Sequence, residues 1–494
     1  MAPNTTDVLT DIEEKKGKFP KAVPYIIGNE AAERFSYYGM RAILSTFLVA
    51  QFFNATKDPA LTAAAEARSN ELVHYFVALA YFMPLVGGIL ADSFFGKYKV
   101  IFYVSILYTI GHLILSLATN NLSLFTVGLI VIAISAGGIK SSVSANVGDQ
   151  FDKSNKHLMS KVYGWFYFSI NAGSVFSTIL IPYLYKEYGA DIAFGVPGIL
   201  MAIATFTFWL GRKKYVRVPP SGLKKENFFF IVIEYFKQLF SNRNGKTVWQ
   251  AVAQKYSAKS ADGVKAVFRV LAVFAFIPIF WAMWDMCLAE WVIQAEKMDL
   301  TVFGHKYIAE QIQTVNPIFV LSCIPLFTYF VYPFFDRVGL KTTPLRRIGA
   351  GLILTALSFV IIALIQEKID AGGHPSIWWQ ILAYFVLSVG EILVSITGLE
   401  YAYTQAPKSM KSTMNAIWLL TVSVGNLFVA AMNGNIASGG YFSKFTGASY
   451  YWLYVGILSG FIIVYLLVSS RLKEKSYIVG EDEDAALLAE SKEP

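Results

Sequence analysis

The amino-acid sequence predicts an all-α membrane protein whose chain crosses the bilayer twelve times, as two six-helix bundles. Of its 494 residues, 55% are apolar and only 15% are charged, and the mean hydropathy is +0.48. A soluble domain carries roughly a quarter charged residues, so most of this chain belongs in lipid. The apolar residues form twelve runs long enough to span, and one long polar break divides these runs into six and six.

Each predicted span is a run of about 20 mostly apolar residues, the length needed to cross the hydrocarbon core of a bilayer. Six such runs precede the polar break and six follow it. The predicted spans are residues 23–53, 72–91, 99–118, 122–147, 159–184, 191–210, 267–294, 309–334, 345–366, 376–405, 411–436 and 448–470.

The polar break is predicted to be a linker between the two halves. It opens with the basic stretch GRKKYVRVPP and then contains ENFFFIVIEYFKQLF, which mixes aromatic and charged residues at helical spacing. This second stretch is too short and too charged to span, which is typical of an amphipathic helix at a membrane surface. Two six-span halves joined in this way predict the major-facilitator architecture, in which cargo binds between the halves. The predicted domains are a tail at 1–22, a bundle at 23–210, a linker at 211–266, a bundle at 267–470 and a tail at 471–494.

The placement of lysine and arginine predicts that both termini face the cytoplasm, because short basic loops stay on that side. The basic residues flank spans and form no basic stripe with aromatics, so no nucleic-acid partner is expected. The first 22 residues resemble no cleavable signal peptide, and we expect a multi-pass protein of the cell (inner) membrane. The basic residues assigned to the cytoplasm are Lys15, Lys16, Lys18, Lys21, Lys97, Lys99, Lys153, Lys156, Lys161, Arg337, Lys341, Arg346, Arg347, Lys408, Lys411, Arg471, Lys473 and Lys475.

Charged side chains in the first predicted span indicate a polar interior. A charge at the bilayer centre costs about 2.5 to 3.5 kcal/mol on insertion scales, so such residues normally face a cavity or each other. In NEAAERFSYYGMR, offsets of 0, 3, 4, 7, 8 and 11 put the polar residues on one helical face. Either this face lines a path for cargo, or its acids and first arginine neutralise one another as a buried ion network. The residues are Glu30, Glu33, Arg34, Tyr37, Tyr38 and Arg41.

Other charges in the spans predict ion pairs between the halves. Arg41 has no acid at helical spacing on its own span, so its partner must come from another helix. The cations Arg41 and Lys140 lie in the first half, and the carboxylates Asp285 and Glu391 lie in the second. Losing one partner of a buried pair costs about 3 to 5 kcal/mol, so such pairs are predicted to hold one end of a cavity shut.

Three further ionisable residues lie in predicted spans. His74 has an ordinary pKa of about 6.5, which suits a proton carrier, although a lone histidine in an apolar helix is often a satisfied packing residue. Glu290 and Glu400 lie closer to helix ends, where we expect them to be solvated or to cap the helix.

Five sequence motifs follow one another along the chain. They are EAAERFSYYG from Glu30 to Gly39, GGILADSFFGKY from Gly87 to Tyr98, FYFSINAGS from Phe166 to Ser174, the pair Asn316 and Pro317, and GEILVSITGLEYAYTQAP from Gly390 to Pro407. Together they resemble the motifs of the proton-coupled oligopeptide transporters of the major-facilitator superfamily. The linker segment WQAVAQKYSAKSADGVKAVFRV is similar to that of the animal-type proteins, and only Gln366 to Ser376 separates spans nine and ten. We therefore expect a bacterial member of the animal-like branch.

The resemblance implies a proton-coupled symporter that imports di- and tripeptides by alternating access between the two bundles. Its driving force would be the proton gradient, so no cofactor is implied. Its partners would be peptides, protons and the lipid bilayer, with no obligatory protein partner.

The resemblance also assigns roles to individual residues. Proton coupling falls to Glu30, Glu33 and His74, the peptide carboxylate to Arg34, Arg41 and Lys140, and the peptide amine to Asn171, Asn316 and Glu391. Gating ion pairs would draw on Arg41, Asp285, Lys140 and Glu391. The pocket-lining positions are Tyr37, Tyr38, Tyr81, Tyr167, Trp281, Ser395 and Trp418.

Three other functions remain open. A relative with another cargo, such as nitrate, is one, although Glu391 and the two asparagines favour a cargo with an amine. A membrane-embedded enzyme is another, but the chain contains neither HExxH nor GxSxG, and we expect it not to be an enzyme. The third is a sensor that binds peptides without moving them.

Overall fold

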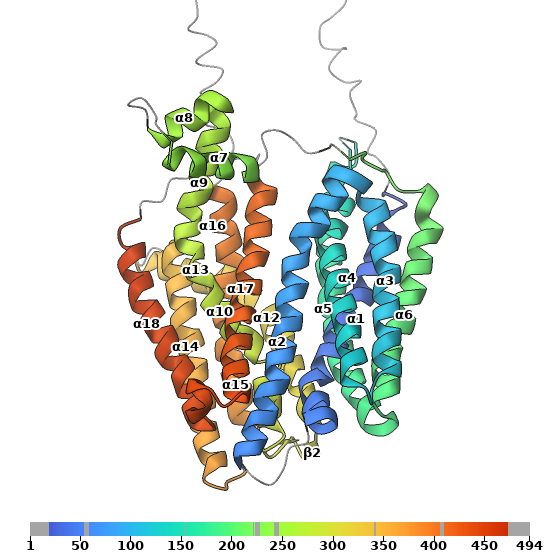
Figure 1. Ribbon diagram of the computed structural model, residues 1–494, viewed down its shortest axis with the longest axis vertical. Helices are drawn as coiled ribbons and strands as arrows, with labels where there is room; N and C mark the ends of the chain where they lie inside the picture. Colours follow the sequence, from blue (N-terminus) through green and yellow to red (C-terminus); the bar gives the residue numbers. More distant parts are fainter. Residues whose placement is uncertain are drawn as a thin grey trace, which may run out of the picture.

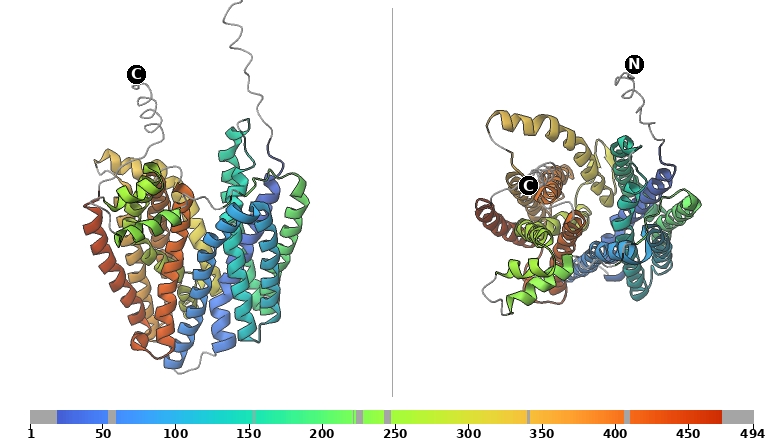
Figure 2. Two further views of the ribbon diagram at one scale, coloured as in Figure 1. Left: turned by 45° about the horizontal axis from the view of Figure 1, so that its top comes forward. Right: turned by 90° about the horizontal axis from the view of Figure 1, so that it is seen from above.

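The computed structural model describes residues 19–53, 59–152, 154–220, 222, 228–241, 247–339, 342–405 and 410–472. The predicted tails lie largely outside these residues. The described part is almost entirely helical, and its helices form two bundles that lie side by side (Figure 1, Figure 2). The predicted all-α membrane fold in two bundles is therefore confirmed.

The first bundle consists of six long helices that correspond to the first six predicted spans. α1 packs against α5 and α6, and α4 packs against both α2 and α3. Their bounds are α1 Val23–Leu48, α2 Pro59–Ile89, α3 Lys97–Leu117, α4 Leu122–Gly148, α5 Met159–Tyr188 and α6 Ala190–Leu210.

The linker forms two short helices at one end of the molecule, α7 Phe228–Leu239 and α8 Val248–Lys255 (Figure 1). α7 lies within the stretch for which an amphipathic helix was expected. Lys255 Nζ donates to Glu234 Oε2 at 2.5 Å and so ties the two helices together. The hydrogen bonds from Lys255 and Gln238 hold the pKa of Glu234 below its ordinary value.

The second bundle contains the remaining helices and one small antiparallel hairpin. α14 packs against α15 and α18, and α10 packs against α17. The bounds are α9 Ala258–Phe274, α10 Ile277–Met286, α11 Glu290–Ala295, β1 Thr301–Val302, β2 His305–Lys306, α12 Val315–Leu326, α13 Tyr332–Arg337, α14 Pro344–Asp370, α15 Trp378–Glu391, α16 Thr397–Gln405, α17 Lys411–Ala437 and α18 Ala448–Ser469.

The seventh span differs from its prediction as one helix over 267–294. It begins earlier, where Ser257 caps α9, and it bends by 48° between α9 and the segment formed by α10 and α11. Pro278 stands in the first turn of α10, where its missing N–H and fixed φ favour a new helix start over continuation of the old one.

The number of spans agrees with twelve once α1 is included. Ten helices of the described chain are long and apolar enough to cross a membrane, and the bent pair of the seventh span makes eleven. α1 is not among them, because it carries Glu30, Glu33, Arg34 and Arg41 within 26 residues. It nevertheless packs inside the first bundle against α5 and α6.

Hydrogen bonds and an ion pair join the two bundles at the end that carries β1 and β2, opposite α7 and α8 (Figure 1). The residues of the second bundle involved lie just before β1 or in the 3-10 segment Ala309–Thr314 that follows β2. The contacts between side chains there include Lys297 Nζ to Glu66 Oε1 at 2.6 Å, Thr46 Oγ1 to Glu310 Oε1 at 2.7 Å, and Thr178 Oγ1 to Thr314 Oγ1 at 2.9 Å.

Candidate functional site

The acids and first arginine of α1 form a buried cluster. Arg34 Nε lies 3.0 Å from Glu30 Oε1 and 2.5 Å from Glu33 Oε2. α5 approaches α1 closely here, because a Cβ on Gly173 would lie 2.8 Å from the carbonyl oxygen of Ala31. Arg34 Nη2, Glu30 Oε2 and Glu33 Oε1 are buried without a hydrogen-bond partner among the described residues. The cluster is thus paired internally, yet it keeps unused donors and acceptors, as a ligand site requires.

Arg41 finds its partner in the second bundle. Its Nη2 lies 2.6 Å from Asp285 Oδ1, and both side chains are 1% exposed. Asp285 Oδ2 in turn accepts a hydrogen bond from Asn426 Nδ2 at 2.6 Å. The Oδ1 of Asn426 lies 2.7 Å from His74 Nδ1. α1, α10, α17 and α2 are therefore connected by one continuous chain of buried polar side chains.

Glu290 extends this chain of buried polar side chains, and its predicted position near water was wrong. We expected it to be solvated or to cap a helix, but it is 3% exposed and both of its carboxylate oxygens lie 3.1 Å from His74 Nε2. Its position near a helix end suggested that Glu290 would face water. Because the helix breaks between α10 and α11, the first residue of α11 points into the interior instead. Glu400, by contrast, is exposed, as expected, and lies 3.7 Å from Arg347.

Lys140 and Glu391 do not form the cross-bundle ion pair that charge placement predicted. Lys140 Nζ lies 3.6 Å from the ring centroid of Tyr81, in cation–π geometry. Glu391 accepts hydrogen bonds from Asn316 Nδ2 at 2.9 Å and Trp284 Nε1 at 2.8 Å, both from its own bundle. In the described residues these partners occupy each group, so the pairing is absent from this conformation.

Apart from Tyr81, which lies against Lys140, four of the predicted pocket residues pack in two aromatic pairs. Tyr37 and Tyr38 pack edge to face on α1, and Tyr37 stacks on Phe76. In the second bundle, Trp281 contacts the ring of Trp418.

The remaining predicted positions are less enclosed. Tyr167 is 45% exposed, and its carbonyl oxygen accepts the hydrogen bond of Asn171 Nδ2 at 2.8 Å. Ser395 is half-buried in the π-helical segment Ile392–Ile396, directly after Glu391. The structure thus gathers the ion-pairing residues tightly, whereas Tyr167 and Asn171 face more open space.

Two residues of the site were not predicted from the sequence. Asn426 links Asp285 to His74, and Trp284 holds Glu391. A signal for Asn426 was present, since Asn426 and Asn433 are polar residues seven apart in an apolar span and so lie on one helical face. Trp284 gave no comparable signal, because a tryptophan in a spanning helix is usually a packing residue.

Comparison with known proteins places this geometry in a family. The model of the POT family matches residues 98–452. Among curated proteins, the chain is 35% identical over 401 residues to mouse "Solute carrier family 15 member 2", covering 77% of this chain and 54% of that protein. It is 35% identical over 376 residues to "Peptide transporter 3" of Caenorhabditis elegans, covering 72% and 52%. The chain thus spans about half the length of these relatives.

Solved structures agree in fold along almost the whole chain. The crystal structure of an auto-inhibited POT family peptide transporter superimposes with a TM-score of 0.86 at 34% identity, covering 93% of this chain and 99% of the other. The POT family transporter PepTSo gives a TM-score of 0.84 at 35% identity, covering 92% and 98%. The matched family model, the relatives and the shared architecture together show that this chain belongs to the POT family.

Proposed function

We propose that the chain is a proton-coupled symporter that imports di- and tripeptides by alternating access between its two bundles. Membership of the POT family and the names of the matched relatives support the transport of peptides. The observation that carries the coupling is the buried polar chain from Arg41 to His74, because it joins a fixed charge, a carboxylate and a titratable imidazole across both bundles.

The orientation in the membrane is part of the proposal. The basic loops support an orientation in which α7, α8 and both termini lie on the cytoplasmic side of the cell (inner) membrane. The end with β1 and β2 then faces outward, and the hydrogen bonds across that end belong to a state closed to the outside.

The charged termini of a peptide would be recognised at two places. Its carboxylate suits the cationic groups of Arg34, Arg41 and Lys140, all of which lie in the first bundle. Its amine suits Glu391, to which Asn316 already donates, with Asn171 on α5 as a further polar contact. A zwitterionic cargo would therefore draw the two bundles together.

The proton and the peptide would act on the same ion pairs. Glu30, Glu33 and His74 are the groups proposed to take the proton. A peptide carboxylate competing for Arg41 would weaken its bond to Asp285, and the bond between Asp285 and Asn426 would transmit that change to His74. The pairs that are occupied then decide which end of the cavity is open.

Uptake of dialanine into proteoliposomes tests the proposal. An inward proton gradient should drive accumulation of labelled dialanine, and excess nitrate should not compete with it. Glu33→Gln keeps the size of the side chain but cannot take up a proton, so it should abolish accumulation while exchange of peptide across the membrane remains detectable. Uptake that ignores the gradient would refute the coupling, and normal accumulation by the variant would remove Glu33 from the proton path.

A further inference from the structure

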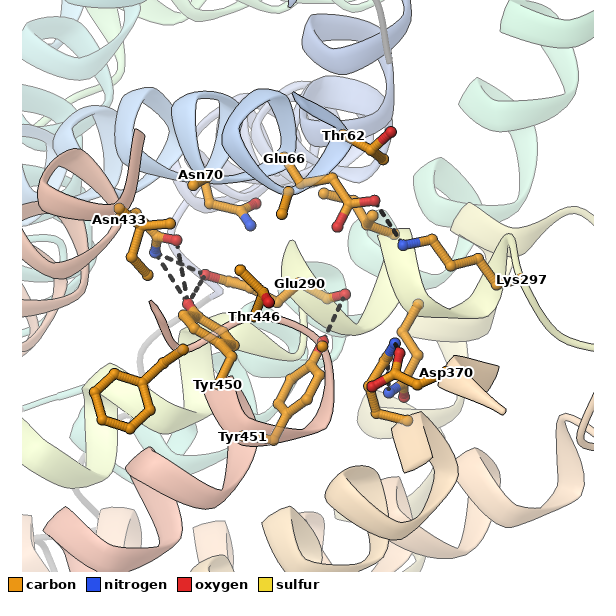
Figure 3. Close-up of a pocket in the computed structure, with 18 residues that line it drawn as sticks. Thr62, Glu66, Asn70, Glu290, Lys297, Asp370, Asn433, Thr446, Tyr450 and Tyr451 are labelled. Carbon is orange, nitrogen blue, oxygen red and sulfur yellow. Dashed lines mark hydrogen bonds and ion pairs between the residues drawn. The ribbon is translucent and has the colours of Figure 1, made fainter. Parts of the chain in front are cut away.

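A polar cavity of about 460 Å³ lies near the outer end of the molecule, between α2, α11, α14, α17 and α18 (Figure 3). Thr62, in the first turns of α2, and Thr446, in the loop before α18, line its outer part. Deeper in, the lining includes Glu290 and Asn433. The cavity therefore leads from the surface loops to the residue that contacts His74.

Glu290 stands between the cavity and the buried polar chain. On the cavity side, its Oε1 accepts from Asn433 Nδ2 and from the hydroxyl of Tyr450, each at 3.3 Å (Figure 3). On the inner side, both of its oxygens contact His74 Nε2 at 3.1 Å. The central residues proposed to bind peptide do not line this cavity, so it is separate from the peptide site.

The hydrogen bonds around His74 determine how many protons its ring and the Glu290 carboxyl group carry together. Asn426 Nδ2 donates to Asp285 Oδ2 at 2.6 Å and to the carbonyl oxygen of Val422 at 3.0 Å, so its Oδ1 is the atom that faces His74 Nδ1. An amide oxygen only accepts, and Nδ1 must therefore carry a hydrogen. The bond between Nε2 and the Glu290 carboxylate then requires one more proton, on the ring or on the carboxyl group. The pair His74 and Glu290 thus holds one exchangeable proton.

We propose that this outer cavity is the port through which protons enter, and that Glu290 is a proton-coupling residue that shares one proton with His74. The inference rests on the proposed proton-driven transport.

The charges around the cavity favour this role. From α2, Glu66 lines it, whereas His74 lies behind Glu290 and does not reach the cavity. From α14 comes Asp370, from α18 come the phenols of Tyr450 and Tyr451, and α11 is followed by Lys297. Lys297 is already paired with Glu66 at 2.6 Å. Three carboxylates, those of Glu66, Asp370 and Glu290, against one ammonium make the lining acidic, and it attracts cations such as hydronium.

The same chain of contacts explains why the proton does not pass straight through. Beyond His74 stands the amide of Asn426, which neither releases nor takes up a proton at neutral pH. Beyond the amide stands the ion pair of Asp285 and Arg41, whose guanidinium is a fixed positive charge that repels protons. A proton arriving at Glu290 therefore stays with His74 until the bundles rearrange.

Glu290→Gln tests the assignment, because it keeps the hydrogen bonds but removes the counter-charge of a protonated His74. Uptake of dialanine is measured in proteoliposomes over external pH, beside peptide exchange without a gradient. We expect the pH midpoint of driven uptake to move acidic by about one unit or more, the usual effect of losing an adjacent opposite charge. Exchange should remain detectable, and Glu290→Asp should recover most of the shift.

The controls separate this inference from the proposed function. Glu400→Gln, on an exposed carboxylate at the far end of the second bundle, should leave the pH profile unchanged. If the unaltered protein shows no gradient-driven uptake, the proposed function fails. If it does, and Glu290→Gln has the same pH profile, the proton port alone is refuted.

Labelling provides a second measurement that does not depend on Glu290. Ala63 lines the outer part of the cavity, whereas its neighbour Ala64 does not. A membrane-impermeant trimethylammonium methanethiosulfonate, applied from outside, should modify Ala63→Cys and lower driven uptake at least about fivefold, with little effect on Ala64→Cys. Failure of the reagent to react, or reaction without loss of driven uptake, would show that protons do not enter here.

Discussion

Arg41 illustrates what a buried charge requires of its surroundings. It is 1% exposed, and its ion pair with Asp285 is a contact between the bundles. Desolvation of two charges offsets most of their attraction, so such a pair contributes little net stability when intact. Removing only one partner is different, because the other charge then stays buried without compensation. The pair therefore contributes more to which surfaces of the two bundles meet than to the net free energy of unfolding.

Asp285→Asn should consequently destabilise the protein by about 3 to 5 kcal/mol, since it leaves Arg41 charged and unpaired. Thermal unfolding in detergent measures this as a marked fall in the midpoint. Asp149→Asn is the matched control, because its ion pair with Lys97 is 19% exposed on both sides and should contribute about 1 kcal/mol or less. Equal shifts for the two variants would show that burial of the pair at Arg41 carries no special cost.

At the scale of elements, glycines set how closely helices approach. Spanning helices gain no hydrophobic free energy from meeting each other in lipid, so close backbone packing has to hold them together. α17 meets α10 at Gly425, where a Cβ would collide with the carbonyl oxygen of Pro278 and lie 2.8 Å from the backbone nitrogen of Ala282. The contacts are backbone atoms, which cannot turn aside as a side chain can. The position of Asn426, next in sequence, therefore depends on this approach.

Gly425→Ala should lower stability by about 1 to 3 kcal/mol, the usual cost of forcing a methyl group into a filled interior. Gly456→Ala on α18 is the control, because nothing lies within 4 Å of a Cβ at that position. Thermal unfolding of the two variants should show a lower midpoint for the first, and an unchanged or slightly higher one for the second. A neutral Gly425→Ala would mean that α17 and α10 can separate without loss.

For the whole molecule, the contacts across the outer end decide which state the structure represents. Thr178 of the first bundle and Thr314 of the second place their hydroxyl oxygens 2.9 Å apart, both in buried side chains. The proposed alternating access requires this end to open in every transport cycle. A covalent link here should therefore hold the protein in one state.

Replacing both threonines by cysteine, Thr178→Cys with Thr314→Cys, brings two sulfurs within reach of a disulfide. Oxidation should abolish uptake of dialanine, and a reductant should restore it. Thr178→Cys alone, oxidised in the same way, should transport normally, since the native Cys287 and Cys323 are both buried. Undiminished uptake by the cross-linked protein, verified by mass spectrometry, would show that this end need not open.

The polar face of α1 shows how far information from neighbouring residues reaches. Helical spacing put Glu30, Glu33, Arg34 and Arg41 on one face, and it showed that Arg41 needs a partner elsewhere. The spans themselves followed from hydropathy, since the length of an apolar run is fixed by the thickness of the bilayer. The bend of the seventh span was missed, because spanning helices tolerate an internal proline and Pro278 in an apolar run does not by itself mark a break.

The sequence by itself therefore determined the class of fold, the approximate spans and the single face shared by the charges of α1, because these depend on residues a few positions apart. Only the tertiary structure decided that Arg41 meets Asp285, that Asn426 joins Asp285 to His74, and that Glu290 is buried. The tertiary structure also decided that Lys140 and Glu391 do not pair. Lys140 lies against the ring of Tyr81, and Glu391 accepts a hydrogen bond from Asn316. The physical reason is that a partner depends on the rotation and depth at which distant helices pack, and helical periodicity carries no information about either.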